Sequence, residues 1–304
     1  TSYSNSGIQT IPFYIFYSMF GFQRIGDLAW AAGDSRSRGF LLGATAGRTT
    51  LNGEGLQHED GHSHLLSATI PNCISYDPCF SYELAVIIQN GLERMIKNQE
   101  DVFYYITIMN ENYTHPEMPK NINEDIIKGI YKYSENKAKG PKVQLMGSGV
   151  ILREVIEAGN ILEKDFNVNS SIFSVTSFTE VRRNALDIQR WNMLNPDKTE
   201  KKSTLDEIII DLESPIITAT DYMKSFAEQI STFLPNKFIS LGTDGFGRSD
   251  SREALRDFFE VDRNHIVIAA LKALTEKQEI EKSVLLSAIK KYKIMNDKPN
   301  PVSL

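Results

Sequence analysis

The sequence predicts an α/β fold in which mostly parallel sheets are covered by helices on their faces. Three observations support this prediction. Short apolar runs rich in β-branched and aromatic residues, typical of buried strands, recur along the chain. Segments with apolar residues three and four positions apart, typical of amphipathic helices, lie between these runs. No internal repeat or low-complexity segment interrupts the alternation, which favours βαβ connections.

The first elements are predicted as follows. From Phe13 to Arg24, aromatic residues recur at three- and four-residue steps, which predicts a helix with one aromatic face. Residues 33–61 are rich in Gly, Ser, Thr and Arg and predict loops between short strands. Residues 73–76 predict a strand.

The next segment predicts a capped helix and a second strand. Asp77 is a candidate N-cap, with Pro78 at the first helical position. The apolar stripe over residues 80–96 predicts the body of the helix. Residues 102–109 are aromatic and β-branched and predict a buried strand.

The stretch 110–139 differs in composition, with prolines followed by many charged and amide residues. We therefore predict a domain boundary near residue 118, which divides the chain into domains 1–118 and 119–304. Strands and helices alternate beyond it. The predicted strands are 143–146, 172–176, 216–220 and 238–241, and the predicted helices are 151–164, 222–233 and 254–259.

Two glycine-rich segments of the second domain resemble ligand-binding loops. Gly147-Ser148-Gly149 begins like a dinucleotide fingerprint, but Leu152 occupies the place of the third glycine, so a tight strand-to-helix turn is favoured. In residues 245–252 the arginines are offset by neighbouring aspartates. This segment is therefore expected to end one element and cap the next.

Composition limits the classes of protein. With 304 residues, 41% hydrophobic and 24% charged, the chain is typical of a soluble globular protein, and its net charge of −6 argues against a nucleic-acid partner. No apolar run approaches the roughly 20 residues of a membrane span, so no membrane partner is expected. The spacing of Cys73 and Cys79 fits neither a redox pair nor a zinc ribbon, which favours a cytoplasmic location. Because residue 1 is Thr, we expect a processed form or a piece of a longer protein.

Three of the five histidines lie within seven residues, at His58, His62 and His64, close to Glu54 and to several glycines. One interpretation is a loop that aims imidazoles into a pocket as acid–base groups tuned by carboxylates. The other is a surface loop whose histidines form only local hydrogen bonds. Composition alone leaves both interpretations open.

The string from His58 to His62 also matches the His-Glu-x-x-His pattern of zinc proteases, which requires both histidines on one helical face. Gly61 lies inside the string and disfavours a helix, and no third ligand is evident. We expect no metal ligands among the site residues.

Several long runs, spread over nearly the whole chain, resemble one known family. They are residues 16–24, 48–64, 71–78, 110–113, 175–180, 190–194, 220–224 and 241–252. The family is the homodimeric bacterial pyruvate dehydrogenases, the thiamine-diphosphate-dependent decarboxylating component of the pyruvate dehydrogenase complex. The resemblance implies two transketolase-like α/β domains: the later part of a pyrimidine-binding middle domain over 1–118, and a C-terminal domain over 119–304.

The resemblance also implies cofactors and site residues. Thiamine diphosphate and Mg²⁺ are expected, and the metal and diphosphate ligands would lie in a domain before residue 1, so that this piece alone would be inactive. Phe20 would pack on the aminopyrimidine ring, and His58 would face the reacting substrate, with Glu54 close to it. The predicted catalytic residues are His58, Tyr17, Glu54 and His64, and the predicted cofactor-binding residues are Phe20, Arg24 and Tyr17.

The implied activity is decarboxylation of pyruvate and transfer of the acetyl group to a lipoyl group, which feeds acetyl-CoA formation. The implied partners are a second copy of the chain in a homodimer and the lipoyl domain of dihydrolipoamide acetyltransferase. A transketolase-like sugar transferase shares the architecture and stays open as an alternative. So does a non-catalytic fragment that serves only dimerisation or docking.

Overall fold

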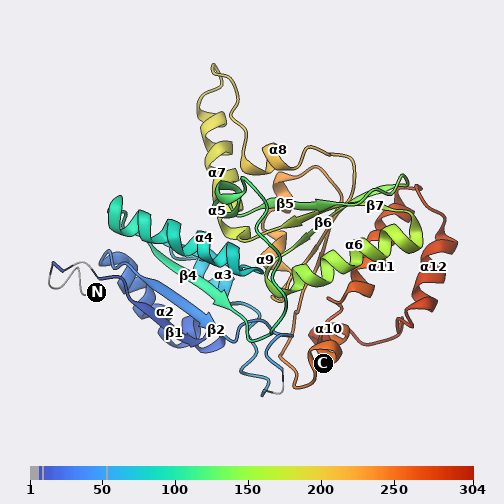
Figure 1. Ribbon diagram of the computed structural model, residues 1–304, viewed down its shortest axis with the longest axis horizontal. Helices are drawn as coiled ribbons and strands as arrows, with labels where there is room; N and C mark the ends of the chain where they lie inside the picture. Colours follow the sequence, from blue (N-terminus) through green and yellow to red (C-terminus); the bar gives the residue numbers. More distant parts are fainter. Residues whose placement is uncertain (1–6, 9, 53) are drawn as a thin grey trace.

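The structure, a computed structural model, describes residues 7, 8, 10–52 and 54–304. It contains two sheets, each with helices on both faces (Figure 1). None of the helices in these residues is long and apolar enough to cross a bilayer.

The first sheet is wholly parallel and has the order β1-β2-β4-β3. Its strands are β1 (Phe13–Tyr17), β2 (Phe40–Ala44), β3 (Cys73–Tyr76) and β4 (Phe103–Ile108). Helices α2 (Ser18–Asp34) and α3 (Ser63–Ala68) lie on one face, and α4 (Ser81–Leu92) covers the other. The carboxyl ends of all four strands therefore point to one edge of the sheet, where ligands of α/β proteins usually bind.

The second sheet has the order β5-β7-β6-β8-β9 and is parallel except for β5 at its edge. Its strands are β5 (Tyr131–Glu135), β6 (Lys142–Gly147), β7 (Asn169–Ser174), β8 (Ile216–Ala219) and β9 (Phe238–Leu241).

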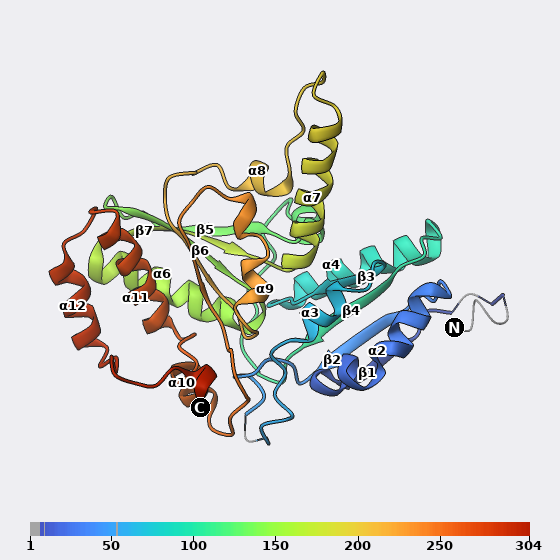
Figure 2. The same ribbon diagram turned by 180° about the vertical axis from the view of Figure 1, so that it is seen from behind.

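Two apolar cores lie on opposite faces of this sheet (Figure 2). The core on one face is formed with helices α6 (Leu152–Phe166), α11 (Arg263–Glu276) and α12 (Lys282–Lys291). The core on the other face is formed with helices α7 (Phe178–Leu194), α8 (Thr204–Ile208) and α9 (Ser225–Glu228). The shorter elements are α5 (Asn123–Lys128), α10 (Arg252–Phe258), the π-helix η1 (Glu93–Lys97) and the 3₁₀ turns η2 (Gly149–Ile151), η3 (Ser231–Phe233) and η4 (Pro301–Ser303).

The predicted fold class, mostly parallel sheets flanked by helices, is confirmed. The helix predicted from Phe13 is wrong in its first five residues, which form β1 and pair in parallel with β2 from Phe13 opposite Phe40. Aromatic and β-branched residues suit a strand, and pairing with β2 satisfies one side of the backbone. The helix begins only at Ser18, with Tyr17 at its N-cap position.

Two other predictions need correction. Asp77 and Pro78 do not start α4, which begins at Ser81; the side chain of Glu83 accepts hydrogen bonds from the main-chain N–H groups of Cys79 and Phe80. The helix predicted over 222–233 is reduced to the short α9 and a 3₁₀ turn.

Candidate active site

A cluster of aromatic and charged side chains forms at the carboxyl end of β1. Tyr17 ends this strand, and Phe20 and Arg24 lie on the first turns of α2. The guanidinium carbon of Arg24 lies 4.1 Å from the centroid of the Phe20 ring. The imidazole of His58 approaches from the loop before α3, with its centroid 5.1 Å from that of Phe20 and 6.0 Å from that of Tyr17.

Glu54 completes this cluster. Its Oε2 lies 3.0 Å from Nδ1 of His58, and both side chains are about one third exposed. A carboxylate on one ring nitrogen orients an imidazole and leaves the other nitrogen free to accept or donate a proton. The structure therefore brings five of the predicted site residues together: Tyr17, Phe20, Arg24, Glu54 and His58.

His62 lies beside this cluster rather than in it. Its Nε2 is 2.7 Å from the side-chain nitrogen of Gln23 on α2. Burial lowers the pKa of His62, and the nearby carboxylate of Asp60 only partly opposes this. A neutral His62 accepts the amide hydrogen of Gln23 and fastens the loop to α2.

His64 lies away from the other predicted site residues. Its side chain is fully buried; its ring stacks on Phe226, with 4.8 Å between centroids, and its Nε2 lies 3.0 Å from Oγ1 of Thr107. Burial lowers the pKa of His64 to about 4. His64 is thus a neutral ring enclosed between the two sheets.

The loop is shaped by a residue that sequence reasoning missed. Oδ1 of Asp60 accepts hydrogen bonds from the main-chain N–H groups of His62 (3.0 Å) and Ser63 (2.9 Å), at the start of α3. The tyrosine hydroxyl of Tyr105 donates to the Ser63 hydroxyl, 2.7 Å away. Aspartate side chains commonly accept main-chain hydrogen bonds two or three residues further along, and the pair Asp60-Gly61 could have indicated such an Asx turn. Residues 58–62 form turns and bends, so His58 and His62 do not share a helical face.

Residues of the second half of the chain also support the loop. Nη1 of Arg48 donates to the carbonyl oxygens of Thr243 and Gly245. Its guanidinium lies so close to Gly61 that a Cβ there would be 2.3 Å from the guanidinium carbon. Burial lowers the pKa of Arg48, and surrounding carboxylates oppose this. No sequence pattern links these positions, because their contacts join residues nearly 200 positions apart.

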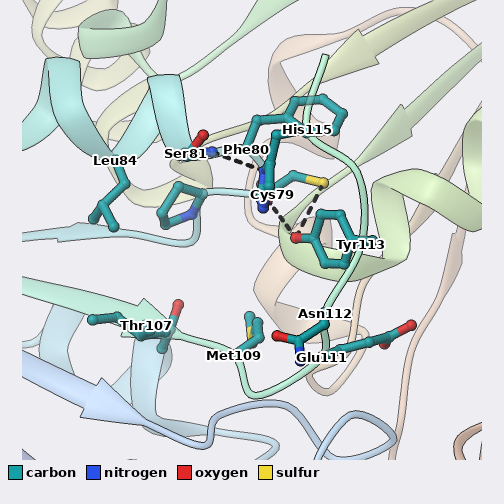
Figure 3. Close-up of a pocket in the computed structure, with 12 residues that line it drawn as sticks. Cys79, Phe80, Ser81, Leu84, Thr107, Met109, Glu111, Asn112, Tyr113 and His115 are labelled. Atoms are coloured by element: carbon teal, nitrogen blue, oxygen red, sulfur yellow. Dashed lines mark hydrogen bonds between the residues drawn. The ribbon is translucent and has the colours of Figure 1, made fainter.

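A separate cavity of about 250 Å³ lies near the carboxyl ends of β3 and β4 (Figure 3). Its residues contact one another: the hydroxyl of Tyr113 donates to the carbonyl of Cys79, and the N–H of Ser81 donates to Nδ1 of His115. Burial raises the pKa of the Cys79 thiol, which therefore stays protonated. None of the predicted site residues lines this cavity.

Among the described residues, one group of three side chains has the spacing of metal ligands: Asp257, Asp262 and His265. Asp262 is already the N-cap of α11, where it accepts a hydrogen bond from the main-chain N–H of His265. The cluster around His58 contributes nothing to this group.

Residues 1–116 match the family described as the pyruvate dehydrogenase E1 component middle domain, and residues 129–262 match the transketolase-like TK C-terminal domain. The chain is 58% identical over 306 residues to the pyruvate dehydrogenase E1 component of Cupriavidus necator, a match that covers 100% of the chain and 34% of that relative. It is 59% identical over 304 residues to the component of the same name from Pseudomonas aeruginosa, over 99% of the chain and 34% of that relative.

The fold is similar to that of transketolase from Campylobacter jejuni, with a TM-score of 0.65 over 86% of this chain and 35% of that chain. The sequence identity of 16% means that this likeness concerns the fold alone. It confirms the transketolase-like architecture. The chain spans about a third of the length of the curated relatives that it matches.

Proposed function

The chain is, over its whole length, a sequence relative of bacterial pyruvate dehydrogenase E1 components, and from this premise we propose that it forms part of an enzyme that decarboxylates pyruvate with thiamine diphosphate. The acetyl group would then pass to the lipoyl group of an acetyltransferase. The observation that carries the proposal is the cluster of Tyr17, Phe20, Arg24, Glu54 and His58 at the carboxyl edge of the first sheet.

This cluster fits the heteroaromatic part of thiamine diphosphate. The Phe20 ring is only partly buried, and Tyr17 is 44% exposed, so a planar ligand can reach both. Stacking on an aromatic ring and contact with a guanidinium both suit an aminopyrimidine. When bound, this cofactor supplies the nucleophile and the electron sink for breaking the bond to the carboxylate. The cluster lacks the set of oxygen ligands that Mg²⁺ needs, so we assign no metal ligand to it.

His58 is the group that we propose for proton transfer. With Glu54 accepting the hydrogen on Nδ1, the neutral ring presents Nε2 as an acceptor, and the protonated ring presents it as a donor. Tyr17, whose ring centroid lies 6.0 Å from that of Phe20, would hold the substrate against this nitrogen by its hydroxyl. We leave His64 out of the site, because its ring is enclosed by side chains.

The partners and the domain division are proposed on the same premise. We propose a homodimer that meets the lipoyl domain of dihydrolipoamide acetyltransferase, with the middle domain ending near residue 118. The thiols of Cys73 and Cys79 are both free and buried, which supports a reducing, cytoplasmic location.

One experiment separates the proposed activity from its alternatives. The protein expressed from its whole coding sequence, supplied with thiamine diphosphate and Mg²⁺, is given either pyruvate with an electron acceptor or a ketose phosphate with an aldose acceptor. We expect carbon dioxide only from pyruvate. Two-carbon transfer between sugars would instead establish a transketolase-like enzyme, and no turnover of either substrate would favour the docking fragment.

A further inference from the structure

The residue next to His58 points the opposite way. Whereas the imidazole of His58 reaches the aromatic cluster, the side chain of Glu59 is fully buried beneath the loop. Its Oε2 lies 2.5 Å from the main-chain nitrogen of Arg248, which donates a hydrogen bond to it. Arg248 lies in the connection between β9 and α10, so the loop of His58 is tied to the second sheet's side of the molecule (Figure 1).

The loop that carries His58 and the connection between β9 and α10 are in close contact at Gly247. At Gly247, a Cβ atom would lie 2.6 Å from Oε2 of Glu59 and 2.6 Å from the carbonyl oxygen of Leu56. Contacts below 3.0 Å with a main-chain atom cannot form without displacement of the loop. Gly247 therefore allows the connection to approach the turn that carries His58.

The carboxyl group of Glu59 sits in a setting that favours its neutral form. Burial raises the pKa of Glu59 to about 8, although the hydrogen bond from Arg248 and the charge of Arg48 act in the other direction. No described residue provides a hydrogen-bond partner for its Oε1. A neutral carboxyl can be replaced by an amide of the same shape, which gives a direct test of its role.

We infer that Glu59, clamped by the main chain at Gly247 and Arg248, is a positioning residue that fixes the turn from which His58 reaches the Tyr17–Phe20 cluster. The turn is closed by a hydrogen bond from the N–H of His58 to the carbonyl of Gly55, 2.9 Å long. Releasing Glu59 frees the residue next to His58, so the imidazole loses its fixed distance from the cluster. A displacement of about 1 Å at a reacting group can lower a rate by about a hundredfold.

Four variants of the protein, expressed from its whole coding sequence, test this inference. Glu59→Ala removes the acceptor, and Gly247→Ala pushes the two loops apart while leaving Glu59 in place. Glu59→Gln keeps an acceptor oxygen for the N–H of Arg248. Arg248→Ala is the matched control, because the bond uses the main chain and not the guanidinium.

Two measurements are made on each variant. Hydrogen–deuterium exchange, read by mass spectrometry on peptides covering 54–60 and 244–250, reports the contact itself and needs neither cofactor nor substrate. We expect faster exchange in both peptides for Glu59→Ala and Gly247→Ala, and wild-type exchange for Glu59→Gln and Arg248→Ala. Pyruvate turnover, which rests on the proposed function, should show kcat lowered about tenfold or more in the first two variants, with KM nearly unchanged.

The outcomes are distinguishable. Unchanged exchange in Glu59→Ala and Gly247→Ala overturns the contact. Faster exchange of the 54–60 peptide in Arg248→Ala overturns its assignment to the main chain of residue 248. Wild-type kcat in both loop variants despite faster exchange overturns the positioning role. If the wild-type protein does not turn over pyruvate, the proposed function fails, and the exchange data still decide the contact. If Glu59→Ala does not fold, Gly247→Ala and the rescue by Glu59→Gln carry the same comparison.

Discussion

The contacts of the His58 ring decide which of its nitrogens can reach a substrate. Because Oε2 of Glu54 contacts Nδ1, Nε2 is the nitrogen that can meet a substrate. The edge-to-face contact with Phe20 holds the imidazole plane at 88° to the plane of the phenyl ring. A group held in this way acts when charge or protons move rather than when the cofactor binds.

We therefore expect His58→Ala, in the protein expressed from its whole coding sequence, to lower kcat for pyruvate about a hundredfold or more. The dissociation constant of thiamine diphosphate should change little, as measured by calorimetry. His62→Ala is the control, because His62 contacts Gln23 and not the cluster, and its loss of kcat should be smaller. A weaker cofactor affinity with normal turnover at saturation would remove His58 from the chemistry.

Phe20→Ala should weaken the binding of thiamine diphosphate more than it lowers kcat. Loss of the ring removes a stacking surface worth about 0.5–1.5 kcal/mol, so the dissociation constant of thiamine diphosphate should rise by up to about tenfold. Phe13→Ala is the matched control, since Phe13 is an exposed ring on β1 that stacks on Phe40 instead. Calorimetric titration of both variants checks this; equal affinities would show that Phe20 is not the cofactor platform.

His64 and Asp77 predict a compensated dependence of stability on pH. Both are fully buried; burial lowers the pKa of His64 to about 4 and raises the pKa of Asp77 to about 7. Between pH 4 and 6.5, the unfolded chain carries one more proton at His64 and one fewer at Asp77 than the folded chain. Their contributions to the slope of stability with pH cancel in the wild type.

Substituting one of the two residues at a time should reveal how the other makes the free energy of unfolding depend on pH. In Asp77→Asn, relative to wild type, the free energy of unfolding should rise as pH increases from 4 to 6.5, by at most about 1.4 kcal/mol per unit. In His64→Gln, it should fall as pH increases over the same range. Urea unfolding at several pH values measures both; slopes of the same sign in the two variants would contradict the assignment.

For single residues, part of the candidate site could be predicted from the sequence. Tyr17, Phe20 and Arg24 were expected in one row, and they lie together even though Tyr17 ends a strand, because it is also the N-cap of α2. His64, which the family resemblance placed among the catalytic residues, lies apart from the cluster in the folded chain. The first turn of α3 rotates His64 away from His58 and into the contact between the sheets.

Short strands bounded by turn residues were the most predictable elements. β3 and β9 have the predicted bounds, because short apolar runs between turn residues have few other stable environments. β1 and β5 were missed: β1 has helix-like spacing and exposed residues, and β5 is half polar. Edge position alone does not explain this difference, because β3 and β9 also lie at sheet edges. All four residues of β3 are buried, whereas β1 and β5 carry exposed residues that weaken the apolar pattern.

The short helix α3 depends on Asp60. Removing its carboxylate leaves the N–H groups of His62 and Ser63 without their acceptor, and an unsatisfied buried donor costs about 1–3 kcal/mol. Asp60→Ala should lower the free energy of unfolding by about this amount, whereas Asp60→Asn retains an acceptor oxygen and should lose less. Urea denaturation compares the two; equal losses would assign the effect to charge, through the nearby guanidinium of Arg48, rather than to these hydrogen bonds.

Buried polar contacts join the two sheet-containing units, in addition to apolar packing, and no local sequence pattern predicts them. Glu83, buried at the start of α4, accepts hydrogen bonds from the hydroxyls of Ser174 (2.6 Å) and Tyr131 (2.7 Å). Its partners lie 91 and 48 residues away, so only the folded chain brings them together. Apolar periodicity predicts which layers form, but it does not specify how one layered unit meets the other.

Asp221 accepts three hydrogen bonds from the segment that leads to the His58 loop. Its Oδ1 accepts hydrogen bonds from the main-chain N–H (2.8 Å) and the hydroxyl (2.7 Å) of Thr49, and its Oδ2 accepts one from the hydroxyl of Thr50 (2.6 Å). All three residues are fully buried. At Gly47, a Cβ would lie 2.2 Å from Oδ2, so the chain leading to the His58 loop lies directly against this carboxylate.

Asp221→Ala should therefore destabilise the protein by several kcal/mol, because each buried donor left without an acceptor costs about 1–3 kcal/mol. Asp221→Asn should lose less, since its carbonyl oxygen still accepts from Thr49. Gly47→Ala reaches the same contact from the other side and should resemble Asp221→Ala in both urea midpoint and turnover. If Asp221→Ala and Asp221→Asn unfold at the same midpoint, apolar packing alone joins the two units, and the loop of His58 does not depend on this carboxylate.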